Sequence, residues 1–269
     1  MLNNLSKYGE NTERMPVVFV GHGSPMNAIE DNEFSRSWQK LSQNIMPPKA
    51  ILCVSAHWET YGTSVTAMEH PPTIHDFGGF PRELYNVQYP AEGSPALASD
   101  LIKNVKSHIV QADLNDWGLD HGTWSVLRHI YPDANIPVLQ LSLNRNLKPA
   151  EHYTLASELQ ALRHKGVLIM GSGNMVHNLR LVDWRNLDNA YTWATEANET
   201  MKNHIVSGNH KALINFTAQG EAFKLSIPTA EHFLPLLYVL GLQQKDEQLT
   251  FFNDKLLMGS LSMTGLIIG

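Results

Sequence analysis

Short apolar runs alternate with amphipathic segments along this chain of 269 residues. Residues 17–20, 51–54 and 167–170 are continuous apolar runs, as expected of strands that are buried on both faces. Residues 32–43 and 149–164 instead place their apolar side chains at helical spacing. This alternation predicts an α/β fold with a central, largely parallel or mixed sheet and helices on both faces.

Residue types at the ends of segments predict further boundaries. Ser94 followed by Pro95 predicts the start of a helix that runs to about residue 107. Thr229 predicts the cap of a helix over residues 229–240. Further helices are expected at residues 120–131 and 189–206, and further strands at residues 63–68, 136–143, 251–252 and 260–268.

Residues 69–93 differ from the rest of the chain because proline and glycine are mixed there with phenylalanine and tyrosine. A long irregular segment inside a domain is usually either functional or disordered. The aromatic content argues against disorder, since disordered segments contain few such residues. We therefore predict a loop that forms the wall of a pocket.

No repeat, low-complexity tract or linker divides the chain, so we expect a polar extension at residues 1–15 and a single domain at residues 16–269. The extension lacks the apolar segment of a signal peptide, and no apolar run approaches the ~20 residues that span a bilayer. These patterns predict a cytoplasmic protein without a membrane partner. No heptad repeat or large apolar stripe is present, so a monomer is expected.

Charge and cysteine content exclude other classes of protein. The net charge is −6, and the chain has no basic block of the kind that binds a phosphate backbone, so a nucleic acid partner is not expected. The only cysteine, Cys53, lies inside an apolar run, where it is expected to be a buried core residue.

Each of the three apolar runs leads into small residues and a histidine. His22 lies in a Gly-His-Gly turn, His57 follows Ser55 and Ala56, and His177 follows a Gly-Ser-Gly turn. Ligands of open α/β sheets bind outside the carboxyl ends of the strands, so these imidazoles are expected to converge. Imidazole binds zinc, iron, copper and nickel, which predicts a mononuclear metal site. At each position an ordinary turn histidine is the alternative.

Three further histidines are candidates for chemistry. His121 follows Asp120 and is a candidate acid/base or substrate-contact residue, His75 lies in the proline-rich loop, and His232 lies in the first turn of the helix expected at residues 229–240. The Gly-Ser-Gly turn before His177 is an alternative anion site, although no second phosphate signal accompanies it. The remaining histidines are expected at the solvated surface: His70, His108, His129, His152, His164, His204 and His210.

None of these histidines forms a local metal-binding motif, but six segments that carry them occur in a recognisable order. Together they resemble the class III extradiol ring-cleavage dioxygenases (LigB-like), and most closely the DOPA 4,5-dioxygenase branch of that family. The resemblance extends from Pro16 to the end of the chain. The segments are residues 21–26 (GHGSPM), 55–58 (SAHW), 75–81 (HDFGGFP), 119–122 (LDHG), 173–178 (GNMVHN) and 231–236 (EHFLPL).

The resemblance implies a single α/β domain with one metal ion, in which O2 cleaves a catechol ring, such as that of DOPA, beside its two hydroxyls to give a semialdehyde. It implies that His22 and His57 are metal ligands and that His177 is either a further ligand or the base. His232 falls where protocatechuate-cleaving members have a ligand glutamate. Glu231 is adjacent, but on a helix it would project about 100° away, so we favour His232.

The metal itself stays open between Fe2+ and Zn2+. Two histidines and a carboxylate suit Fe2+ with open positions, whereas four histidines suit tetrahedral zinc. Fe2+ is expected for ring cleavage, in which His121 or His177 would accept a substrate proton. The alternatives are a zinc-dependent hydrolase that uses a metal-bound hydroxide and a structural zinc site. The residues expected to line the substrate pocket are Ser24, Trp58, His75 and Phe77.

Overall fold

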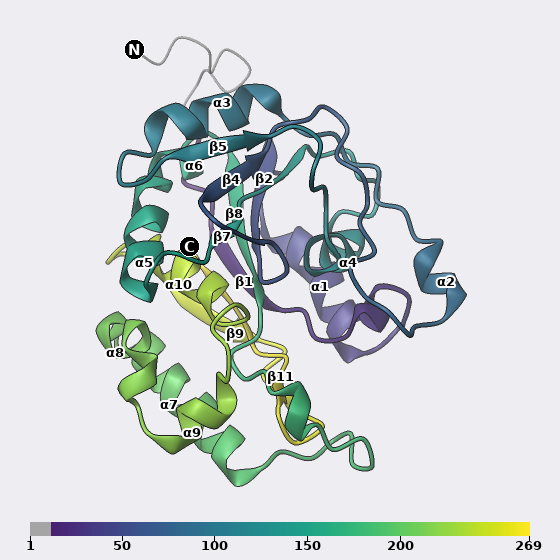
Figure 1. Cartoon of the computed structure of the whole chain (residues 1–269), viewed down its shortest axis with the longest axis vertical. Coiled ribbons are helices and arrows are strands. Elements are labelled where there is room, and N and C mark those ends of the chain that lie inside the picture. The colour runs from purple at the N-terminus through teal and green to yellow at the C-terminus, as the bar shows by residue number, and fades with distance from the viewer. Residues whose placement is uncertain (1–11) are drawn as a thin grey trace.

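A six-stranded mixed sheet crosses the centre of the molecule (Figure 1), in a computed structural model that describes residues 12–269. The strand order is β6-β2-β8-β1-β12-β9. Strands β6, β2, β8 and β1 are parallel to one another, whereas β12 is antiparallel to both β1 and the edge strand β9, which confirms the expected sheet. The bounds are β1 Val17–Gly21, β2 Ala50–Ser55, β6 Val138–Gln140, β8 Val167–Gly173, β9 Leu249–Phe252 and β12 Gly265–Ile268.

The remaining strands form three small two-stranded sheets: β3 (Glu59–Thr60) with β7 (Leu143–Asn144), β4 (Thr63–Thr66) with β5 (Val110–Asp113), and β10 (Leu256–Leu257) with β11 (Leu261–Ser262). The strand expected at residues 136–143 is therefore divided. The amide of Leu141 still donates to the carbonyl of Cys53 in the central sheet. The next amide, that of Ser142, donates to the carbonyl of Ser64 in β4, so the chain leaves the central sheet here.

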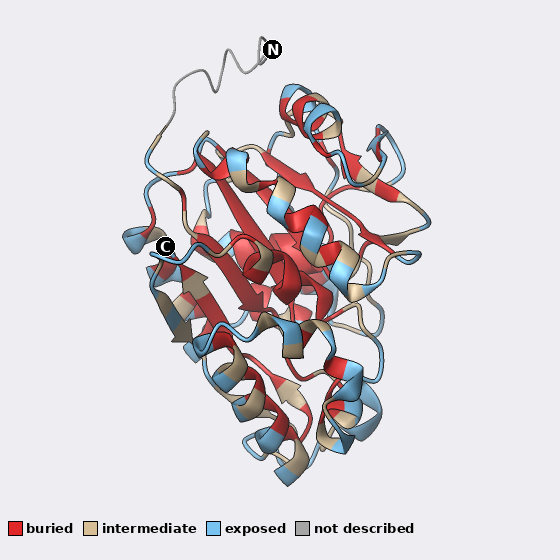
Figure 2. Ribbon diagram, turned by 90° about the vertical axis from the view of Figure 1, so that its left-hand side faces the viewer, coloured by how far each residue is buried: buried red, intermediate tan, exposed pale blue. Residues whose placement is uncertain are grey.

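Helices cover both faces of the central sheet because successive strand residues point to opposite sides. In β1, Val17 and Phe19 belong to a core shared with α5 and α10, whereas Val18 and Val20 belong to a core shared with α1 and α4. Figure 2 shows the buried central strands between these layers. The helices are α1 Glu33–Asn44, α2 Arg82–Tyr85, α3 Pro95–Asn104, α4 His121–Ile130, α5 Pro149–Glu158, α6 Gln160–Arg163, α7 Thr192–Val206, α8 His210–Ile214, α9 Glu221–Ser226 and α10 Leu234–Gly241, with 3-10 turns η1 Pro25–Ala28, η2 Leu179–Leu181 and η3 Phe216–Ala218.

Most helix starts agree with the capping signals. Ser94 accepts from the amide of Leu97 at the start of α3, and Asp120 accepts from the amide of Thr123 at the start of α4. The helix expected at residues 229–240 is wrong at its beginning, because α10 starts at Leu234 and the preceding residues form turns. Thr229 caps no helix; its hydroxyl donates to Glu231.

Two other expectations concern burial. Cys53 is buried and free, as expected. His152, expected at the surface, is instead fully buried, with its Nδ1 3.0 Å from the hydroxyl of Tyr238. Among residues 12–269, no helix is long and apolar enough to cross a membrane.

The expected extension at residues 1–15 lies largely outside the described residues, which begin at residue 12. Its last residue, Met15, is buried, and its carbonyl accepts from the guanidinium of Arg163 at 2.7 Å.

Candidate functional site

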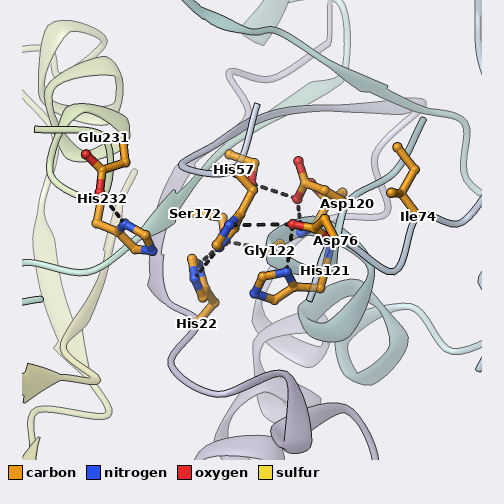
Figure 3. A network of polar contacts seen from close by, with 12 residues as sticks. His22, His57, Ile74, Asp76, Asp120, His121, Gly122, Ser172, Glu231 and His232 are labelled. Atoms are coloured by element: carbon orange, nitrogen blue, oxygen red, sulfur yellow. Dashed lines mark hydrogen bonds and ion pairs between the residues drawn. The ribbon is translucent and has the colours of Figure 1, made fainter. Parts of the chain in front are cut away.

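Three histidines from different parts of the chain converge at the carboxyl ends of the parallel strands β1, β8 and β2. His22 follows β1, His57 follows β2 and His232 precedes α10. The Nε2 atoms of His22 and His57 are 3.0 Å apart. One nitrogen of each of the three rings lies within 4.8 Å of the others, which is close enough for all three to hold one metal ion. Figure 3 shows His22 and His57 close together, between His232 on the left and His121 with Asp76 on the right.

Glycines at the end of β8 let the segment of His232 approach the strand. A Cβ atom at Gly173 would lie 2.1 Å from the carbonyl oxygen of His232, and one at Gly171 would lie 2.4 Å from that of Pro235. The amide of Asn174 donates to the same His232 carbonyl at 2.8 Å, and the amide of His177 donates to Ser226. Residues 171–173 form the end of β8 rather than a turn, and these two amides are engaged by the protein itself, so they are not open to an anion.

The ring of His177 stacks face to face on the ring of His232. The two rings are stacked, with centroids 3.5 Å apart and planes inclined by 7°. An imidazole binds a metal through a lone pair that lies in the plane of its ring. Two parallel rings stacked in this way do not direct their lone pairs at a common point. The geometry therefore favours His177 as a neighbour of the metal site over His177 as a fourth ligand.

Glu231 turns back towards His232 instead of projecting away from it. Its Oε1 is 3.2 Å from Nδ1 of His232, and the angle expected for a helix does not apply because both residues lie in a turn. Burial alone would raise the pKa of Glu231, but hydrogen bonds from His232, from the backbone and from Thr229 outweigh it and hold the pKa at about 2. The ionised carboxylate thus accepts from Nδ1 of His232 and leaves Nε2 free.

His121 occupies the first position of α4 and forms a pair with Asp76 of the proline-rich loop. The Oδ2 atom of Asp76 lies 2.9 Å from Nδ1 of His121 and 3.5 Å from Nδ1 of His57 (Figure 3). Burial acts to raise the pKa of Asp76, but hydrogen bonding and attraction to His121 outweigh it and lower the pKa. The sequence did not predict a role for Asp76, although this residue lies beside His75 in residues 75–81, one of the six segments that carry the family resemblance.

Ser172 contacts His22 in a way that determines which ring nitrogen carries the proton. Its hydroxyl donates to the carbonyl of Gly122 at 2.5 Å, so it must accept from Nδ1 of His22, at 2.9 Å. Gly122 lets the start of α4 lie close to His57, since a Cβ atom at Gly122 would be 3.0 Å from Cδ2 of His57. Sequence reasoning missed Ser172, which nothing but its position in β8 distinguishes.

Burial keeps the clustered imidazoles neutral. It lowers the pKa of His22 and of His57 well below the ordinary value, and neighbouring imidazoles add to the effect. The pKa of His177 is lowered to about 3, again first by burial and then by His232. The pKa of His232 is lowered too, because burial outweighs the opposing effect of Glu231. A neutral imidazole is the form that binds a metal.

The four residues expected to line the substrate pocket take different positions. Phe77 presents its ring to His121, with centroids 5.5 Å apart. His75 bonds through Nε2 to the carbonyl of Val87, 3.0 Å away, and so holds the loop together. Trp58 is buried and stacks on Trp117, whereas Ser24 is exposed and caps η1.

Comparison with known proteins identifies the family. Residues 16–263 match the family described as the catalytic LigB subunit of aromatic ring-opening dioxygenase. A 4,5-DOPA dioxygenase extradiol of Escherichia coli (strain K12) is 49% identical over 262 residues, which are 96% of each chain. The protein of that name from Beta vulgaris is 38% identical over 83% of this chain and 85% of its own.

A solved structure supports the same assignment. The crystal structure of an uncharacterized protein from Escherichia coli K12 superimposes with a TM-score of 0.84 at 45% identity and covers 95% of this chain and 100% of its own. With the clustered histidines at the sheet edge, these likenesses show that the chain belongs to the LigB family of aromatic ring-opening dioxygenases.

Proposed function

We propose that this enzyme opens the ring of a catechol beside its two hydroxyls with O2, and that DOPA is a substrate. The family accounts for ring opening, and the names of the relatives from Escherichia coli and Beta vulgaris support DOPA. The observation that carries the proposal is the convergence of His22, His57 and His232 at the edge of the sheet. A zinc-dependent hydrolase would leave the family membership unexplained.

His22, His57 and His232 would hold the metal ion, because all three are neutral and offer a nitrogen to the same volume. The Nε2 atoms of His22 and His57 are 3.0 Å apart, which is close enough for one ion to bind both.

We favour Fe2+ because zinc is redox-inert and cannot take part in electron transfer to O2. When bound, the ion would lower the pKa of the catechol hydroxyls and provide the path for electrons to O2.

Two imidazoles outside the ligand set would handle protons. His177, stacked on His232, is neutral at pH 7 because burial lowers its pKa, and it would accept the proton of a phenol whose own pKa the bound ion has lowered. His121 donates Nδ1–H to Asp76 and turns Nε2 to the site, which suits it to accept or return a proton. Phe77, against His121, would exclude water from this side of the substrate.

Metal-loading experiments test the proposal. Metal-free protein is loaded with Fe2+ or Zn2+ without oxygen, DOPA is added, and O2 is then admitted while the yellow semialdehyde product is followed by absorbance. We expect product with Fe2+ alone. Hydrolysis of esters or amides with Zn2+ and without O2 would instead support the hydrolase.

Variants test the ligand set. His22→Ala and His57→Ala should each lose tight metal binding, while His70→Ala, on the surface, should keep it. A stoichiometric ion retained by both of the first two variants would refute the site.

A further inference from the structure

Asp76 connects two imidazoles that have different roles in the proposed function. Its Oδ2 lies 2.9 Å from Nδ1 of His121 and 3.5 Å from Nδ1 of His57, and its Oδ1 accepts from the backbone amide of His121 at 2.9 Å. The side chains are largely buried, with 12% of Asp76, 7% of His121 and 19% of His57 exposed. Water therefore competes little for these contacts.

A carboxylate can only accept hydrogen bonds, so Nδ1 of His121, which bonds to Asp76 at 2.9 Å, carries a proton. Nδ1 of His57 lies 3.5 Å from the same carboxylate oxygen, beyond a close hydrogen bond, but a proton on this nitrogen is attracted to the carboxylate whereas a lone pair is repelled. A ring that carries its one proton on Nδ1 presents an unprotonated Nε2. Ser172 imposes the same form on His22, whose Nε2 lies 3.0 Å from Nε2 of His57. With Nδ1–H on both rings, both Nε2 lone pairs face the same volume. That arrangement of two lone pairs is suited to a shared cation.

The loop that carries Asp76 is tied to the start of α4, so the carboxylate is held in place. The amide of Ile74 donates to Leu119 at 2.7 Å, and the indole of Trp124 donates to the carbonyl of Ile74 at 2.8 Å. Figure 3 shows Ile74 and Asp76 beside the end of α4 that carries His121. The irregular segment at residues 69–93 thus delivers a carboxylate to the site.

We propose that Asp76 is a shared positioning residue, which holds the metal ligand His57 and the proton-transfer residue His121 in the form with Nδ1–H and directs both Nε2 atoms into the site. The inference rests on the proposed function for the roles of the two histidines. Carboxylates that orient a ligand histidine typically contribute 10- to 100-fold to metal affinity or activity. One carboxylate here would serve both.

Nuclear magnetic resonance of metal-free protein tests the proposal without reference to activity. With 15N-labelled histidine at a single pH near 7, long-range proton–nitrogen spectra report which ring nitrogen carries the proton, and His57→Gln and His121→Gln assign the signals. We expect Nδ1–H for both rings in the wild type, with the downfield proton shift of a hydrogen bond to a carboxylate for His121. A predominant Nε2–H form of either ring would overturn the proposal.

Two variants extend the test. Asp76→Asn replaces one acceptor oxygen by an amide donor and should shift at least one ring away from the Nδ1–H form, while Asp76→Glu should retain it. The affinity for Zn2+, measured by competition with a chelator, should fall about 10- to 100-fold in Asp76→Asn. Asp133→Asn, at an exposed position, is the matched control and should change neither property.

A folded Asp76→Asn protein with wild-type ring protonation and wild-type Zn2+ affinity would refute the positioning role. Circular dichroism checks that the variant is folded, and the wild-type spectrum decides the question by itself if it is not. If the wild type has both rings in the Nδ1–H form and binds metal, but cleaves no catechol with Fe2+ and O2, the proposed function fails and the role of Asp76 stands.

Discussion

At the scale of single residues, the contacts of the second ring nitrogen distinguish the histidines of the site. His22 contacts a serine, His57 and His121 share an aspartate, and His232 contacts the adjacent Glu231. These partners hold each Nδ1 and leave Nε2 for the site. Because all the rings are imidazoles in a small volume, their chemical roles follow from orientation rather than from residue type.

The stacked orientation of His177 makes a prediction that separates a base from a ligand. His177→Gln should keep one metal ion per chain, because the ring is parallel to His232 and does not point at the ion. Its kcat for ring opening should fall about 10²- to 10⁴-fold, as expected for the loss of a general base. Metal content by atomic emission and turnover with DOPA check both parts, with exposed His70→Gln as the control. Loss of the ion from His177→Gln would instead identify a fourth ligand.

At the scale of elements, strand ends were predictable but the turn before α10 was not recognised. Thr229 resembles a helix cap, yet Pro235 cannot lie in the interior of a helix because it lacks an amide proton and collides with the carbonyl four residues earlier. The helix therefore begins at Leu234, where the proline lies in its first turn. This late start leaves Glu231 and His232 in a turn, where the carboxylate can reach its neighbour.

The close approach of this turn to β8 predicts the effect of one methyl group. Gly173→Ala would place Cβ 2.1 Å from the carbonyl oxygen of His232, so the two segments must separate. The free energy of unfolding should fall by about 1–3 kcal/mol, and the affinity for Zn2+ should fall at least tenfold because His232 moves. Urea denaturation and chelator competition measure the two effects.

Gly78→Ala is the matched control for this substitution, since a Cβ atom there meets nothing within 4 Å. If Gly173→Ala and Gly78→Ala have the same free energy of unfolding and the same affinity for Zn2+, the approach of His232 to β8 does not depend on Gly173.

At the scale of the whole molecule, the sequence predicted those features that depend on local patterns of apolar and small residues. The parallel sheet and the convergence of His22 and His57 follow from apolar runs that end in small residues. Asp76 and Ser172 were not predictable in the same way, since each acts on a ring that is distant along the chain. The burial of His152 was missed for this reason, because its partner Tyr238 lies 86 residues away.

His152 lies on α5 and contacts Tyr238 of α10. Its burial makes the stability of the whole fold sensitive to acid. Burial lowers the pKa of His152 from the ordinary value of 6.5 to about 4. Between these two pH values the unfolded chain binds a proton that the native protein does not, so the free energy of unfolding falls as the pH falls. For one such histidine the free energy of unfolding is about 3 kcal/mol lower near pH 4 than above pH 6.5, where the full stability is present.

Replacing His152 by glutamine should remove the part of the acid sensitivity that His152 causes, because glutamine does not titrate. In urea denaturation of metal-free protein between pH 7 and pH 4, His152→Gln should lose stability less steeply than the wild type, by up to about 1.4 kcal/mol per pH unit. The comparison of slopes holds even if the substitution lowers stability by a constant amount. His70→Gln, at the surface, should keep the wild-type slope. If His152→Gln keeps it as well, the buried ring takes up its proton in the native protein and the packing of α5 against α10 accommodates the charge.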